Sequence, residues 1–221
     1  MEVFQFGRYQ VELFLPEIGN CEQAIWLLAS SGEGDCVWDL LEEKFPLFVL
    51  SGLDWNRDLS PWAADRLYAS SEPFSGGADD FLRQLVGEIM PECEQALPSP
   101  PKERAIAGYS MAGLFSLYAI YRCTEFVRAA SVSGSLWFDG WEEYALTNRT
   151  AVPCPKLYLS LGNKEHRVRN PRMASVRDCT ERLAAEWKRR GFPTLFEINP
   201  GGHFQEPELR TARALTRLLS L

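Results

Sequence analysis

Apolar and polar residues along the chain follow two recurring patterns, one typical of strands and one typical of helices. Short apolar runs between turn-forming residues predict strands at 4–14, 23–29, 47–50, 104–107, 127–132, 155–161 and 194–198. Apolar residues at helical spacing predict helices at 35–44, 78–97, 111–122, 173–190 and 207–219. Because strands and helices alternate, the pattern favours an α/β fold with a mainly parallel sheet.

The connections between these elements indicate where a functional site would form. Residues 51–76 form a long segment rich in Pro, Trp, Ser and Asp, and residues 98–101 form a Pro-rich link. Parallel sheets build their sites from the loops that leave the carboxyl ends of the strands. We therefore expect functional residues in the loops 51–58, 108–112, 133–138, 162–170 and 199–205.

The segment 104–115 carries the most specific motif, because an apolar strand, the sequence Gly-Tyr-Ser-Met-Ala and an apolar helix follow one another directly. This is the layout of a nucleophile elbow, in which a strained turn exposes a serine hydroxyl. Ser110 is therefore the candidate nucleophile, and the small Gly108 and Ala112 let the helix pack close to the strand. An ordinary strand-to-helix turn, with Ser110 as the helix cap, is the alternative interpretation.

A serine nucleophile needs a base, and the chain contains two histidines, His166 and His203. His203 follows the last predicted strand in Asn199-Pro200-Gly201-Gly202-His203, where two glycines allow the loop to bend toward the elbow. We predict that His203 is the general base. The alternatives are a loop histidine that bonds only the backbone, or His166 in its place.

The third member of a triad is expected after the preceding strand, which gives the chain order serine, acid, histidine. Glu165 is the first acid in Gly162-Asn163-Lys164-Glu165, so we predict that it orients the imidazole. Asp178 is the second choice, although it lies in a predicted helix. A surface role for Glu165 beside Lys164, with a serine–histidine dyad doing the chemistry, stays open.

An oxyanion hole needs two backbone N–H groups that point at the developing charge. One is expected from Met111, the residue after the nucleophile, and the other from Leu53 in the loop after the strand 47–50. Other residues of these loops suit substrate binding: two aromatic residues for stacking and three polar residues for hydrogen bonds, namely Trp55, Trp137, Asp54, Asn56 and Ser135. The alternative is that the tryptophans of these loops only cover the core, an interpretation that suits Trp62 equally well or better.

Composition excludes several classes of partner. The 221 residues carry a formal net charge of −7, whereas nucleic acids and anionic membranes attract a basic face. We see no run of about 20 apolar residues and no basic, apolar leader at the N-terminus, so a cytoplasmic location is the default expectation. The six cysteines form no C-x-x-C pair, which favours reduced, mostly buried thiols and no metal.

With these motifs in place, the chain from about residue 45 onward resembles the esterase D-like ("putative esterase") family of α/β-hydrolases. The matching pieces are Ser51-Gly52-Leu53, the elbow, the segment 162–165 and Gly202-His203-Phe204. The resemblance implies a single α/β-hydrolase domain over 1–221 with minimal or no lid. It also implies a serine esterase that acts on a small-molecule ester without metal or organic cofactor. Acyl transfer to another acceptor, a non-catalytic binding protein of the same fold, and a homo-oligomer remain open.

Overall fold

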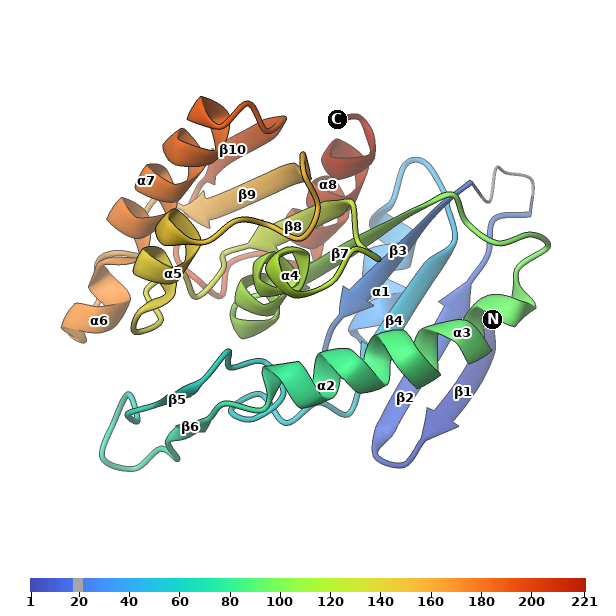
Figure 1. The fold of residues 1–221 in the computed structure, drawn as a ribbon, viewed down its shortest axis with the longest axis horizontal. Helices are drawn as coiled ribbons and strands as arrows, with labels where there is room; N and C mark the ends of the chain where they lie inside the picture. Colours follow the sequence, from blue (N-terminus) through green and yellow to red (C-terminus); the bar gives the residue numbers. More distant parts are fainter. Residues whose placement is uncertain (18–21) are drawn as a thin grey trace.

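The computed structural model describes residues 1–17 and 22–221, and most of the strands in these ranges form one large sheet (Figure 1). Its strand order is β1-β2-β4-β3-β7-β8-β9-β10. Within this sheet, β1 pairs antiparallel with β2 and β2 with β4, whereas the other pairs are parallel. The predicted α/β fold with a mainly parallel sheet is confirmed. The strands are β1 (Glu2–Phe6), β2 (Tyr9–Phe14), β3 (Gln23–Leu28), β4 (Leu47–Ser51), β7 (Glu103–Tyr109), β8 (Arg128–Val132), β9 (Lys156–Gly162) and β10 (Thr194–Asn199).

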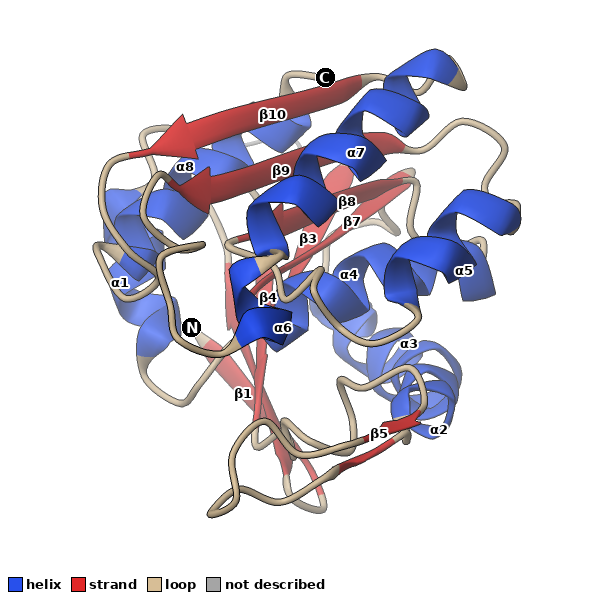
Figure 2. Ribbon diagram, turned by 90° about the vertical axis from the view of Figure 1, so that its left-hand side faces the viewer, coloured by secondary structure: helices blue, strands red, loops and turns tan. Residues whose placement is uncertain are grey.

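Helices cover both faces of this sheet (Figure 2). α1 (Glu33–Leu40) and α8 (Pro207–Leu219) pack on one face, against strand residues such as Ile25. α4 (Met111–Arg122), α5 (Trp141–Thr147), α7 (Val176–Arg189) and the helical segment 78–96 pack on the other face, around Trp26. Successive strand residues point to opposite faces, so burial on both sides explains the continuous apolar runs of the central strands.

The first predicted strand, 4–14, is wrong in one respect, because the structure divides it into β1 and β2. Phe6 pairs with Tyr9, which leaves Gly7 and Arg8 as a two-residue turn. Gly7 has a φ of 60°, a conformation that such a turn requires and that glycine adopts without strain. Gly7 is the residue that indicates a hairpin in the sequence. The apolar residues on both sides of it favoured one continuous strand instead.

The predicted helix 78–97 is present but irregular. It consists of α2 (Ala78–Gln84), a π-helical turn η1 (Leu85–Ile89), α3 (Met90–Cys93) and a 3₁₀ turn η2 (Glu94–Ala96). Pro91 has no N–H, and its ring crowds the carbonyl of Gly87 four residues earlier, so the backbone widens just before it.

Other boundaries also differ from the predicted ones. The helix expected at 35–44 is α1 and ends at Leu40, and the helix expected at 173–190 is preceded by a short α6 (Pro171–Ala174). The helix α5 was not predicted. The segment 51–76 contains the short pair β5 (Ala63–Ala64) and β6 (Phe74–Ser75), which lies away from the main sheet in Figure 1.

Five cysteines are described, and none of these five forms a disulfide. Cys93 and Cys179 are buried and Cys123 is half-buried, whereas Cys36 and Cys154 are exposed. The expectation of mostly buried thiols is therefore wrong for the last two, which lie on polar helix and loop surfaces. Cys21 lies outside the described residues. Within 1–17 and 22–221, no helix combines the length and apolar character that a bilayer span requires.

Candidate active site

Ser110 lies in the sharp turn between β7 and α4, with a φ of 59° and a ψ of −121°. Its N–H donates to the carbonyl of Val132, which ties the turn to β8. A Cβ on Gly108 would come within 2.4 Å of the Ala112 Cβ, and one on Gly113 within 2.9 Å of the Gly108 carbonyl. The small residues thus allow the close approach of helix and strand that the elbow motif predicts.

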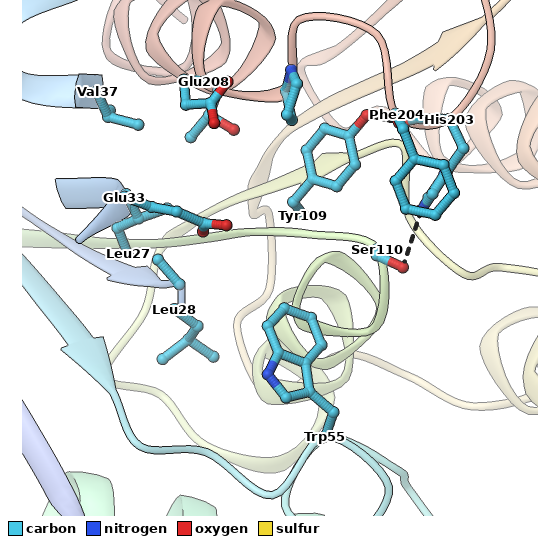
Figure 3. A pocket seen from close by; sticks show the side chains of 13 residues that line it. Leu27, Leu28, Glu33, Val37, Trp55, Tyr109, Ser110, His203, Phe204 and Glu208 are labelled. Atoms are coloured by element: carbon cyan, nitrogen blue, oxygen red, sulfur yellow. Dashed lines mark hydrogen bonds between the residues drawn. The ribbon is translucent and has the colours of Figure 1, made fainter. Parts of the chain in front are cut away.

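His203 and Glu165 come together with Ser110 at the carboxyl end of the sheet. The loop after β10 places His203 Nε2 3.1 Å from Ser110 Oγ, as the dashed line in Figure 3 shows. The loop after β9 places Glu165 Oε2 2.9 Å from His203 Nδ1. With the proton on Nδ1, the imidazole donates to the carboxylate and can accept the serine proton at Nε2.

The Glu165 carboxylate is buried, and both of its oxygens accept hydrogen bonds. Its Oε1 accepts hydrogen bonds from the Gly162 N–H at 2.5 Å and from the Ser133 hydroxyl at 2.7 Å. Burial on its own would raise the pKa of Glu165, but the hydrogen bonds from His203, Gly162 and Ser133 outweigh it and hold the pKa below its ordinary value. The carboxylate therefore stays ionised beside the imidazole.

Two further residues of this network, Arg210 and Ser133, were not predicted. Arg210 Nη1 lies 3.3 Å from Glu165 Oε1, and Ser133 has a φ of 47°, which is strained for a residue other than glycine. A signal for Arg210 was present, because it shares the apolar stripe of α8 with Ala214 and Leu218 at a spacing of four residues. A cation on the apolar face of a helix calls for a buried partner.

The alternative residues lie elsewhere. Asp178 is exposed on α7, and the carboxylate that the structure places on the imidazole of His203 is that of Glu165. His166 lies next to Glu165 in the sequence, but its Nδ1 is buried without a hydrogen-bond partner among the described residues. The structure thus brings His203 and Glu165 to Ser110, and neither alternative.

The two residues expected to supply oxyanion donors, Met111 and Leu53, lie in different backbone settings. Met111 begins α4, so its N–H belongs to the first helical turn, which has no partner within the helix. Leu53 follows Gly52, which has a φ of 80° and lies so close to the Arg8 carbonyl that a Cβ would come within 2.0 Å of it. The loop is held by Asp58, which accepts hydrogen bonds from the Asp54 N–H and from Arg8.

Two cavities meet at Ser110 and His203. One of about 300 Å³ is mainly apolar and lined by Leu27, Leu28, Val37 and Trp55 (Figure 3). The other, of about 550 Å³, is lined by Ser110, Trp137, Tyr68 and Met173 among others. Phe204, whose surface is 90% exposed, lines both of them.

The residues expected to bind substrate divide between these cavities. Trp55 lines the smaller one, and Asn56, Ser135 and Trp137 line the larger one. Ser135 Oγ lies 3.3 Å from Ser110 Oγ. Asp54 lines neither cavity, so the expectation of substrate binding does not match its position. Its carboxylate accepts hydrogen bonds from the backbone N–H groups of Asn56 and Arg57 and so stabilises the turn that these residues form.

Comparison with known proteins agrees with this arrangement. Residues 43–207 match the model of the Esterase family, described as "Putative esterase". The chain belongs to this family. It is also 24% identical over 157 residues to the protein YbbA of Bacillus subtilis (strain 168), which covers 68% of this chain and 63% of that protein.

Solved structures show the same fold at low sequence identity. The IroE-like serine hydrolase from Shewanella oneidensis has a TM-score of 0.80 at 18% identity, over 96% of this chain and 76% of that chain. The siderophore hydrolase EstA from Aspergillus nidulans has a TM-score of 0.74 at 18% identity, over 96% of this chain and 90% of that chain. The predicted α/β-hydrolase fold is confirmed.

Charges differ between the two cavities of this family member. Glu33 and Glu208 line the smaller cavity, whereas Lys164, Arg167 and the hydrogen-bonded Glu165 line the larger one. Arg172 packs over the Trp137 ring at 5.7 Å and stabilises the wall of the larger cavity. In the ranges 1–17 and 22–221, no cluster of three His, Cys, Asp or Glu side chains is arranged to hold a metal ion.

Proposed function

We propose that the chain is a serine esterase that hydrolyses a small-molecule carboxylic ester through an acyl-enzyme formed on Ser110. His203 acts as the general base, and Glu165 orients and stabilises it. The observation that carries this proposal is the continuous pair of hydrogen bonds, 3.1 Å from Ser110 Oγ to His203 Nε2 and 2.9 Å from His203 Nδ1 to Glu165. Membership of an esterase family supports the same reaction.

Each step of the proposed reaction has a residue assigned to it. As Ser110 Oγ attacks the ester carbonyl, its proton moves to His203 Nε2. The oxyanion of the tetrahedral intermediate accepts hydrogen bonds from the N–H groups of Met111 and Leu53. Collapse releases the alcohol, which takes the proton from His203. Water then attacks the acyl-serine while His203 accepts its proton, and the carboxylic acid leaves as Ser110 regains its hydrogen.

The cavities indicate the kind of ester. The two halves of the substrate have separate places, an apolar one near Trp55 and a larger one with aromatic and cationic walls. Lys164 and Arg167 suit a substrate half that carries aromatic rings or negative charge. Two similar structures bear the name siderophore hydrolase, which supports a small-molecule ester as the substrate. The net charge of −7 disfavours nucleic acid and anionic membranes as partners.

A panel of short acyl, aryl and sugar esters tests this function. The purified chain should hydrolyse at least one class, and Ser110→Ala or His203→Ala should lower kcat by at least about 1,000-fold. His166→Ala provides a matched control and should retain activity. Full activity of Ser110→Ala, or loss in His166→Ala but not in His203→Ala, would refute the assignment.

Product analysis separates hydrolysis from acyl transfer, which uses the same catalytic groups. Turnover in the presence of added alcohols or sugars should yield mainly the free acid. A new ester as the dominant product would identify an acyltransferase. A folded chain that turns over no ester in the panel and forms no acyl-enzyme would instead indicate a binding protein.

A further inference from the structure

A buried positive charge lies directly behind the proposed triad. Arg210 extends from the first turns of α8, and its side chain is only 3% exposed. Nη1 lies 3.3 Å from Glu165 Oε1, 3.3 Å from Ser133 Oγ and 3.4 Å from the Tyr109 hydroxyl. Nη2 donates to the Pro200 carbonyl at 2.6 Å. One guanidinium therefore joins the acid of the triad to the loop that carries its histidine.

The loop that carries His203 is held a second time through the same network. The Tyr109 hydroxyl donates to the carbonyl of His203 itself, and Tyr109 immediately precedes Ser110. Arg210 thus contacts groups on β7, on the loop after β8, on the loop after β9 and on the loop after β10. These are the segments whose relative positions set the distances within the triad.

Besides these contacts, the positive charge of Arg210 affects the protonation state of His203 through Glu165. In the resting state the histidine must be neutral to act as a base, so it cannot balance the buried carboxylate of Glu165. An ionised carboxylate without a cation is costly at such a site. The other charged groups that face the pair are less suited. Lys164 and Arg167, which line the larger cavity with Glu165, are exposed, and Glu208, which lines the smaller cavity with His203, is negative.

We propose that Arg210 is a positioning residue that balances the charge of Glu165 and holds the loop of His203, and so keeps the imidazole neutral and in register with Ser110. This inference rests on the proposed esterase function. Without the guanidinium, the uncompensated carboxylate would stabilise the imidazolium form of His203. The base would then be protonated, and inactive, over a wider range of acidic pH.

The direction in which the pH dependence of kcat/KM moves tests this proposal. Loss of one positive charge next to the carboxylate should move the acid limb of kcat/KM to higher pH, by about one unit. Arg210→Met should show that shift together with a lower kcat. Arg210→Lys should keep the acid limb near its wild-type position, because the charge remains. Its kcat should still fall, because one ammonium group cannot replace the forked contacts to Glu165 and the Pro200 carbonyl.

Arg217→Met is the matched control, since Arg217 is an exposed arginine on the same helix. Its pH profile should coincide with that of the wild type. If Arg210→Met does not fold, as judged by circular dichroism, Arg210→Gln carries the test, because glutamine is neutral and can still donate to a carbonyl.

The outcomes separate this inference from the proposed function. An active wild type, together with a neutral variant whose acid limb coincides with that of the wild type, would overturn the role of Arg210 and leave the esterase function intact. A folded wild type that hydrolyses none of the esters would instead refute the function itself. A shift in the neutral variant and none in Arg210→Lys is the expected result.

Discussion

Replacement of Gly108 by alanine inserts a methyl group into the contact between β7 and α4. The new Cβ would lie 2.4 Å from the Ala112 Cβ, 2.6 Å from the Ala112 carbonyl carbon and 2.7 Å from its oxygen. Carbon atoms in contact prefer about 3.5–4.0 Å, so the overlap exceeds about 1 Å. Two of the three atoms belong to the backbone of α4, and they can move only if the first turn of the helix moves.

The cost follows from this overlap. Overpacking typically destabilises a fold by about 1–3 kcal/mol, and the rigid neighbours place Gly108→Ala near the upper end. For a chain of this size, about 3 kcal/mol corresponds to a fall in Tm of about 6–12 °C. A shift of α4 also displaces Ser110 from the imidazole, and a displacement of about 1 Å can lower the rate about 100-fold.

Gly87→Ala is the matched control, because a Cβ at exposed Gly87 has no atom within 4 Å and the residue lies in a helical segment. This variant should be as stable as the wild type or more stable, by up to about 1 kcal/mol. Thermal unfolding followed by circular dichroism, and kcat/KM on a 4-nitrophenyl ester, measure both effects. Wild-type Tm and activity in Gly108→Ala would refute the argument from close helix–strand packing.

Three further predictions concern the acid, the rim of the cavities and the thiols. Glu165→Gln should lower kcat by at least about 100-fold. Since the pKa of Glu165 is depressed in the fold, its ionised form stabilises the folded state above about pH 4.3. This contribution is lost as the pH falls through the depressed pKa. The free energies of unfolding in urea of the variant and the wild type should therefore converge in acid. Phe204→Ala should raise KM about tenfold with little change in kcat, because the exposed Phe204 ring lines both cavities and offers apolar surface for a substrate to cover. Equal KM values would contradict this. Burial, helped by neighbouring carboxylates, raises the pKa of Cys93 to about 12, so at pH 8 Ellman's reagent should modify exposed Cys154 and leave Cys93 intact until the chain unfolds.

Much of the fold could be predicted from local pattern. Continuous apolar runs such as 104–107 and 155–161 predict strands buried on both faces, and their alternation with helices predicts a parallel sheet. The same pattern failed where a single residue overrode it. Gly7 turned an expected strand into a hairpin, and Pro91 forced a π-helical turn into a helix of otherwise regular periodicity.

The candidate site divides in a similar way. The meeting of Ser110, His203 and Glu165 could be predicted because each follows a strand and because their order along the chain is characteristic of a triad. Arg210 was not predicted, because its partner is 45 positions away in the sequence and the two meet only when α8 packs beneath the loops. Asp54 had the right residue type beside the right loop, but its carboxylate is used by the backbone of its own turn.

The most direct test of the account is whether Ser110 is an activated nucleophile. The folded chain should react with a fluorophosphonate to give a single adduct, and peptide mass spectrometry should locate it on Ser110. Ser110→Ala should give no adduct, and His203→Ala should react far more slowly. An adduct on another residue, or equally fast labelling of Ser110 in His203→Ala, would contradict the central claim that His203 activates Ser110.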